Sequence, residues 1–166
     1  MTIAKVAGVS IRTRIVAAVA LTALALLIAF SLLIALMVWY GVAPSGAVVW
    51  LPAFTALAVA AALAVGVWLA ALNVRYRDIK YAVPFLVQLW LFASPVAYPT
   101  TIVPERWRPL LGLNPMAGVV EGFRWALVGG PKPGAVVFVS AAGTILLLLG
   151  GIAYFQRVER TFADVI

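Results

Sequence analysis

Four apolar runs dominate this chain and restrict the environments in which it can fold. They occupy 15–40, 48–72, 82–98 and 134–155. A helix needs about 20 apolar residues to cross roughly 30 Å of hydrocarbon, and only the third run falls short of that length. With 66% hydrophobic and 10% charged residues, the chain is too apolar for a water-soluble domain. We therefore predict an all-α integral membrane protein with four transmembrane helices.

The third run has two features that a plain spanning helix does not need. Pro95 removes a backbone hydrogen bond near its far end, so the helix should kink or stop there. Gln88 is its strongly polar side chain, and in hydrocarbon it should seek an interhelical partner or a wet lumen. In the fourth run, three glycines predict close approach of a neighbouring helix. They are Gly143, Gly150 and Gly151.

A short basic segment, 73–81, separates the second and third runs. Cytoplasmic loops retain an excess of Lys and Arg, so this segment predicts the orientation of the chain. With the N-terminus in the cytoplasm, most of the 12 Lys and Arg residues fall on the cytoplasmic side. The basic residues left outside are Arg106, Arg108, Arg124 and Lys132. We therefore predict a multi-pass protein with both termini in the cytoplasm.

The stretch between the third and fourth runs is too long for a simple turn and too apolar for a solvated loop. Asn114 followed by Pro115 indicates the start of a helix, and the pair at 129–130, Gly-Gly, indicates its end. A second, shorter helix should begin at Pro104 and end near Leu113. We predict a re-entrant hairpin at 104–128 on the outer face. The alternative is a pair of amphipathic helices lying flat among the headgroups.

Two sets of side chains stand out on the longer of these predicted helices. One set is apolar and recurs at spacings of three and four, which places it on one face. Its members are Met116, Val119, Val120, Phe123 and Leu127. The other set is Glu121 and Arg124, which are three residues apart on a different face and can form an ion pair.

Several function classes are disfavoured by what the sequence lacks. The chain has no His and no Cys, which removes the commonest general base, the commonest metal ligand and any thiolate. It has no phosphate-binding loop, and the interiors of its spans carry no charge, which argues against a proton-coupled pump. The net charge of +7 is explained by the basic flanks of the spans, without nucleic acid as a partner. We predict no enzymatic activity, no metal and no cofactor on this chain.

Several stretches resemble a known family in order and in spacing. They are ALNVRYRDIKYAVPFLVQLWLFASPVAYP at 71–99, VPERW at 103–107, LNPM at 113–116, EGFRWA at 121–126 and the tail at 154–166. Together they cover about the last two-thirds of the chain. They are similar to the permease subunit of ABC-2 type exporters. The resemblance is greatest to permeases for O-antigen, capsule and teichoic-acid polysaccharides.

The resemblance implies an architecture and a set of partners. The four runs correspond to the family's third to sixth spans, and the predicted hairpin falls where short gate helices close the outer end of a channel. A homodimer would form with a second permease copy in the bacterial cytoplasmic (inner) membrane. It would contact membrane lipids, carry a lipid-linked glycan, and dock a cytoplasmic ABC ATPase subunit that holds ATP and Mg²⁺. The N-terminal third of the family pattern has no counterpart, so we expect 1–166 to be a single, N-terminally truncated permease domain.

Three groups of residues are candidates for function, and each has a simpler interpretation. The first group lies in the basic loop at 73–81 and would contact the ATPase or line the cytoplasmic entrance of the channel. In the simpler interpretation these residues only anchor the helices at the membrane surface. They are Arg75, Tyr76, Arg77, Asp78 and Lys80. Polar or aromatic side chains would line the channel and stack on sugars, or they would be packing residues; they are Gln88, Trp90, Phe92 and Tyr98. The predicted outer gate consists of Trp107, Asn114, Met116, Glu121, Phe123 and Arg124, of which Asn114 is also explained as a helix cap.

The residues leave two functions open. The first is the membrane subunit of an ATP-driven exporter of lipid-linked polysaccharide. The second is a non-transporting scaffold that binds a partner through its basic loop, or else an inactive truncated permease fragment. The Pro95 kink and the aromatic third run favour transport, because a scaffold gains nothing from either.

Overall fold

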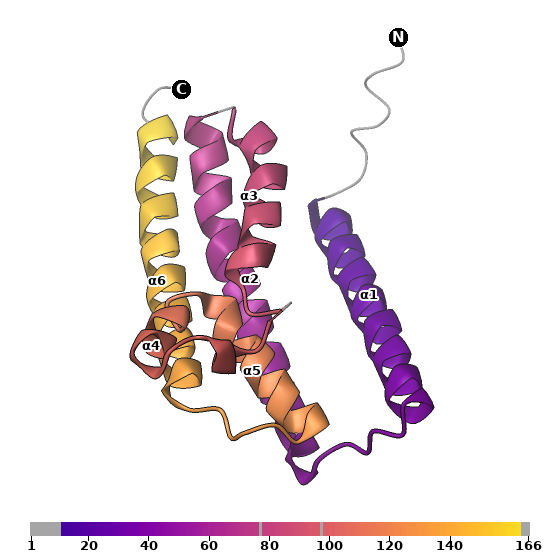
Figure 1. Cartoon of the computed structure of the whole chain (residues 1–166). Helices are drawn as coiled ribbons and strands as arrows, with labels where there is room; N and C mark the ends of the chain where they lie inside the picture. Colours follow the sequence, from indigo (N-terminus) through magenta and orange to yellow (C-terminus); the bar gives the residue numbers. More distant parts are fainter. Residues whose placement is uncertain (1–10, 77, 97, 164–166) are drawn as a thin grey trace. The chain divides into compact units, whose positions relative to one another are not determined.

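The computed structural model describes residues 11–76, 78–96 and 98–163, and the regular elements in these ranges are all helices (Figure 1). This confirms the predicted all-α class. The chain divides into two units, Met1–Ala43 and Pro44–Ile166. The second unit contains all the packed helices discussed below.

The first unit contains one long helix, α1 (Ile11–Trp39), which matches the first predicted span. Its two central hydroxyl groups bond to the helix itself. Thr22 Oγ1 donates to the Ala18 carbonyl at 2.9 Å, and Ser31 Oγ donates to the Ile28 carbonyl at 2.8 Å. Because both hydroxyl groups are satisfied within the helix, the central part of α1 can face lipid.

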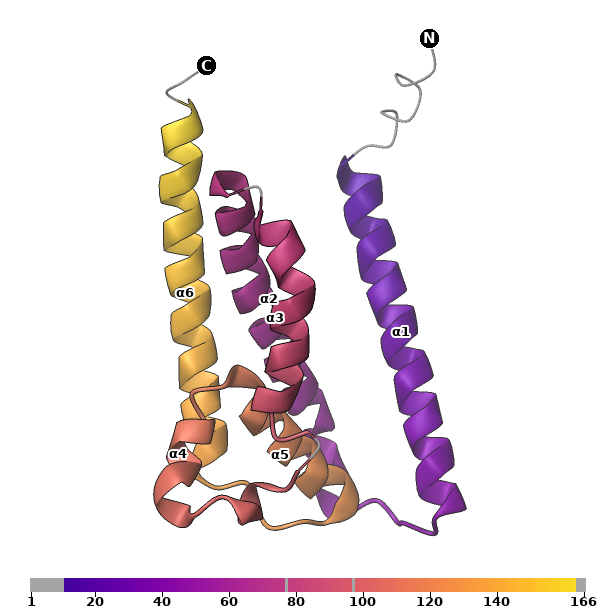
Figure 2. The ribbon, with the colours of Figure 1, turned by 45° about the horizontal axis from the view of Figure 1, so that its top comes forward.

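The second unit is built on two parallel helices. They are α2 (Leu51–Arg75), which follows the 3-10 turn η2 (Gly46–Trp50), and α6 (Ala135–Ala163). These helices pack side by side and run in the same direction, while the shorter α3 (Ile79–Ala93) returns antiparallel along α2 (Figures 1 and 2).

Trp68 joins α2 to α6. Its Nε1 donates to the Leu147 carbonyl at 2.8 Å, and its ring stacks on Tyr154 with centroids 5.2 Å apart. A Cβ at Gly151 would lie 2.9 Å from this indole, so the predicted close approach is confirmed there. Gly143 faces open space, and the same prediction is wrong for that residue.

We expect Trp68→Phe to weaken the contact between α2 and α6. The substitution keeps an aromatic ring but removes the donor to Leu147, which should cost about 1 kcal/mol of unfolding free energy. SDS-induced unfolding in mixed micelles measures the loss. Trp39→Phe in α1 is the matched control, because Trp39 is 84% exposed. Equal effects of the two substitutions would show that the Leu147 bond contributes nothing specific.

Three of the four apolar runs lie in helices that are long and apolar enough to cross a membrane. Among the described residues these spans are Val16–Trp39, Gly46–Asn73 and Ala135–Glu159. The third run differs from prediction, because α3 has 15 residues and ends at Ala93, five residues before the end predicted at Tyr98. Ser94 adopts an extended backbone with ψ 139°, and Pro95 then has no N–H to continue the helix.

The chain between α3 and α6 forms short helical pieces and one longer helix. In order they are η3 (Thr100–Ile102), η4 (Glu105–Trp107), α4 (Arg108–Leu111) and α5 (Pro115–Val128). The predicted short helix from Pro104 to Leu113 is confirmed as a helical stretch that starts after Pro104, although it ends at Leu111. The segment is divided between η4 and α4, since Pro109 has no N–H with which to bond one turn back. The α5 helix packs against η2, α2 and α6, at the end of the unit where α2 and α6 begin (Figure 2).

Candidate functional site

Asn114, the N-cap of α5, connects the end of α3 to the start of α5. Its Oδ1 accepts from the Met116 N–H at 3.0 Å, which confirms the predicted cap. The same oxygen accepts from Trp90 Nε1 at 3.2 Å. Its Nδ2 donates to Ser94 Oγ at 2.9 Å and to the Ala93 carbonyl at 3.2 Å. The sequence predicted the cap, whereas the attachment to α3 is a finding of the structure.

Ser140 of α6 holds the same corner from the other side. This fully buried hydroxyl accepts from the Gly118 N–H at 3.0 Å and lies 3.1 Å from two carbonyl oxygens, those of Gly112 and Asn114. One side chain thereby satisfies backbone groups both before and inside α5. A buried, unpaired backbone group costs about 1–3 kcal/mol, so these bonds stabilise the corner.

The face of α5 that packs against α2 and α6 is its small one. Gly118, Gly122 and Ala126 are all buried and recur every four residues. A Cβ at Gly118 would lie 2.7 Å from the Ser140 Cβ, and one at Gly122 would overlap the Phe54 ring. Small residues at this spacing let helix backbones approach closely.

The predicted apolar face of α5 is therefore only partly the packing face. Val119 and Leu127 are buried, but the larger side chains of Met116, Val120 and Phe123 are only half-buried. The repeat of Gly118, Gly122 and Ala126 is the sequence signal for this packing face. It was missed because the prediction considered only the large apolar side chains of this helix.

Ser45 secures the far end of α5. Its hydroxyl lies 2.7 Å from the Ala126 carbonyl and 3.1 Å from the Trp125 carbonyl, and its N–H donates to the Leu127 carbonyl at 3.4 Å. The last carbonyls of a helix have no partner within it, so Ser45 supplies one. Both ends of α5 are thus fixed to the second unit, and Gly129, with φ 72°, ends the helix as predicted.

Glu121 and Arg124 hold the loop that follows α3. Arg124 donates to the Tyr98 carbonyl at 3.1 Å and to the Val96 carbonyl at 2.9 Å, while Glu121 accepts from the Thr100 hydroxyl. The predicted ion pair between Glu121 and Arg124 is wrong. Although both residues are described, each bonds to the loop instead of to the other.

A groove of about 460 Å³ lies between α2 and α3 and reaches the start of α5. Its walls are apolar except for Gln88, Ser94 and the Trp90 indole, and Met116 of α5 lies at one end. The structure thus brings two predicted channel residues, Gln88 and Trp90, together with the predicted gate residue Met116. Phe92 and Tyr98 do not line this groove, so their channel role stays a prediction, as does a gate role for Trp107 and Phe123.

The basic loop lies at the opposite end of the second unit. A side-chain hydrogen bond with Tyr154 of α6 raises the pKa of Arg75, the last residue of α2. Lys80 Nζ lies 4.8 Å from the Tyr81 ring centroid. Tyr76, Asp78 and Lys80 are exposed, and Arg77 lies outside the described residues. The loop therefore presents its charges at the surface while Arg75 connects it to α6.

Most of this chain is similar in sequence to known proteins. Residues 4–128 match the model of the family described as ABC-2 type transporter. The O-antigen export system permease protein RfbA of Myxococcus xanthus is 34% identical over 128 residues, which are 75% of this chain and 49% of that protein. Two proteins of the same name from Klebsiella pneumoniae are 23% and 22% identical, over 76% and 81% of this chain. The chain spans about half the length of the curated relatives that it matches.

Proposed function

Because the chain belongs to the ABC-2 type transporter family, we propose that it forms the transmembrane path of an exporter for lipid-linked polysaccharide. The likeness to O-antigen export permeases supports a polysaccharide as cargo. The observation that supports the proposal is the apolar groove between α2 and α3, which reaches Met116 at the start of α5. Such a groove offers a moving amphiphile an apolar wall with few polar contacts.

We place this exporter in the bacterial inner membrane with four spans. Three of these spans are the helices long enough to cross the membrane. The remaining one, third in chain order, consists of α3 and the residues that follow it toward Tyr98, since α3 alone is only about 22 Å long at 1.5 Å per residue. The bias of basic residues puts both termini in the cytoplasm. The hairpin at 104–128 then lies at the outer face, where it re-enters the membrane and closes the path.

The α5 part of the hairpin can re-enter the membrane because one face of α5 is buried against protein, whereas Glu105, Arg106 and Trp107 before it are exposed. Lipid does not tolerate unpaired backbone groups at depth. Here Ser140 and Asn114 satisfy the turn between α4 and α5, and Ser45 satisfies the end of α5. These contacts favour a hairpin inserted among helices over one resting on headgroups.

ATP hydrolysis belongs to a separate ABC ATPase subunit in this proposal, and ATP and Mg²⁺ bind there. A second copy of the permease completes the path as a homodimer. The loop meets the ATPase through Arg75, Asp78 and Lys80, which are exposed, and through Arg77. The loop is thus a docking surface as well as a membrane anchor.

We expect charge reversal of the loop to release the ATPase. The triple variant Arg75→Glu, Arg77→Glu, Lys80→Glu should lower co-purification of the ABC ATPase subunit at least tenfold, because opposed charges no longer meet across the contact. The matched control reverses Arg106 and Lys132, which the proposal places on the other side of the membrane. Unchanged retention by the loop variant, or equal loss in the control, would contradict the docking role.

Export itself is tested by where the cargo appears. Cells that contain the permease and its ATPase should display lipid-linked glycan on the outer leaflet, where an impermeant lectin binds it. Loss of display on deletion of this chain supports the proposal. Normal display without the chain would favour the non-transporting scaffold.

A further inference from the structure

Two adjoining polar cavities lie where the loop after α3, the middle of α5 and the start of α6 meet. The larger measures about 300 Å³, and its charged lining consists of Glu105, Arg108, Glu121 and Lys132. The smaller measures about 100 Å³ and adds Trp125 and Arg124, whose guanidinium already donates to the Tyr98 and Val96 carbonyls. Thr100, Thr101, Glu121 and Lys132 line both. These cavities are separate from the apolar groove and face a different set of side chains.

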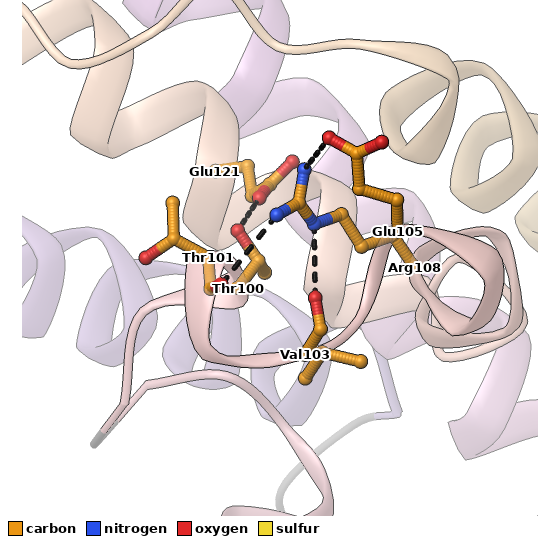
Figure 3. Close-up of polar contacts among 6 residues, drawn as sticks. All are labelled: Thr100, Thr101, Val103, Glu105, Arg108 and Glu121. Carbon is orange, nitrogen blue, oxygen red and sulfur yellow. Dashed lines mark hydrogen bonds and ion pairs between the residues drawn. The ribbon is translucent and has the colours of Figure 1, made fainter.

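Three polar side chains of the larger cavity, Thr100, Arg108 and Glu121, are held by hydrogen bonds before any ligand arrives. Arg108 Nε donates to the Val103 carbonyl at 3.1 Å, and its Nη1 lies 3.5 Å from Glu105 Oε1 (Figure 3). The Thr100 hydroxyl donates to Glu121, which fixes that carboxylate on α5 (Figure 3). Groups fixed in this way lose little freedom on binding, which favours affinity.

The charges around the larger cavity cancel. Two carboxylates, Glu105 and Glu121, balance two basic groups, Arg108 and Lys132. A phosphate ion in this cavity would be repelled by both carboxylates, and a divalent cation would be repelled by both basic groups. No cluster of three or more metal-ligating residues occurs in the part of the chain that the structure describes. The lining therefore suits a neutral ligand that both donates and accepts hydrogen bonds.

We infer that the two cavities form a binding subsite for a neutral hexose unit of the exported glycan. Each sugar hydroxyl donates and accepts, which matches a cavity lined by both carboxylates and basic groups. The C–H face of a pyranose packs on an indole, and Trp125 supplies one in the smaller cavity. Thr101 and Lys132 are exposed and add a hydroxyl and an ammonium group. The inference rests on the proposed function only for the identity of the cargo.

Saturation-transfer NMR on the chain in nanodiscs tests this binding directly. The sugar probes are methyl α-D-mannopyranoside, methyl α-L-rhamnopyranoside and methyl β-D-galactopyranoside, and the ionic probes are glucuronate and inorganic phosphate. Because the assay reads weak contacts, it needs neither the ATPase nor the lipid carrier. We expect transfer to at least one neutral glycoside and at least fivefold less to glucuronate, with no phosphate line broadening.

Two variants separate this site from other surfaces. Thr101→Val and Lys132→Met each replace an exposed group, and each should lower the transfer at least threefold while circular dichroism stays unchanged. Thr22→Val in α1, whose hydroxyl bonds only within its own helix, should leave the transfer as it is. Should one of the two variants misfold, the other decides the outcome.

Three results would overturn the inference: no transfer to any glycoside, equal or stronger binding of the ionic probes, or transfer that survives both variants. These results leave the export proposal standing, because display of glycan on the outer leaflet is measured independently. Conversely, sugar binding without any effect of the chain on display would contradict the export proposal and keep the subsite.

Discussion

Gly122→Ala should destabilise the second unit by about 3 kcal/mol, at the upper end of the usual cost of overpacking. The added methyl group would overlap the Phe54 ring, which is itself buried and packed edge-on against Trp125 at 6.4 Å. The Phe54 ring would have to turn toward the apolar cavity that it lines together with Trp125, or α5 would have to shift away from α2. SDS-induced unfolding in mixed micelles measures the loss.

Two further substitutions make the Gly122 prediction specific. Gly143→Ala adds the same methyl group in α6, where nothing lies within 4 Å, and it should be neutral or slightly stabilising. Phe54→Ala combined with Gly122→Ala should lose less than the sum of the two single losses, because the ring that obstructs the methyl group is gone. Equal stability of the two alanine variants would show that α5 does not pack against α2 as described.

Asn114→Leu should cost about 3 kcal/mol and release the end of α3 from the start of α5. The substitution removes a helix cap, worth about 1 kcal/mol, together with bonds to Trp90, Ser94 and the Ala93 carbonyl. Leucine has similar bulk, so the loss reports hydrogen bonds and not a cavity. The apparent unfolding free energy and the proteolysis rate of the loop at 94–113 both measure it.

A graded series separates the functions of Asn114. Asn114→Asp keeps the acceptor for Met116 and Trp90 but loses the donors to Ala93 and Ser94, so its cost should be intermediate. Trp90→Phe removes a single bond and should cost about 1 kcal/mol. If Asn114→Leu lost only about 1 kcal/mol and the other two variants lost nothing, Asn114 would act through its cap alone, and the link between α3 and α5 would contribute nothing.

The helices and the ends of α5 were predictable from sequence because local chemistry determines them. Apolar length identified α1, α2 and α6, and Asn114-Pro115 and Gly129 marked the start and end of α5. These signals act over one or two turns and need no tertiary partner. The match of residues 4–128 to the ABC-2 type transporter family bears out the resemblance and includes every stretch that carries it except the tail at 154–166.

The contacts across the site were less predictable, because they depend on which helix lies opposite. Glu121 and Arg124 are well spaced to pair, yet each finds a stronger set of partners in the loop after α3. The importance of Gly118 and Gly122 depends on Ser140 and Phe54, which come from two other helices. Pro95 predicted either a kink or a stop in the third helix. The structure shows a stop, because α3 ends at Ala93.

Cysteine accessibility along α5 tests most directly whether the hairpin closes an aqueous path. The chain has no Cys of its own, so single substitutions report without background. Met116 faces the groove and Val120 is half-buried, whereas Ala117 and Ala126 are fully buried. With an impermeant thiol reagent added outside intact cells, Met116→Cys and Val120→Cys should react at least tenfold faster than Ala117→Cys and Ala126→Cys. Uniform protection of all four positions, with only lipid-soluble reagents reacting, would contradict the account.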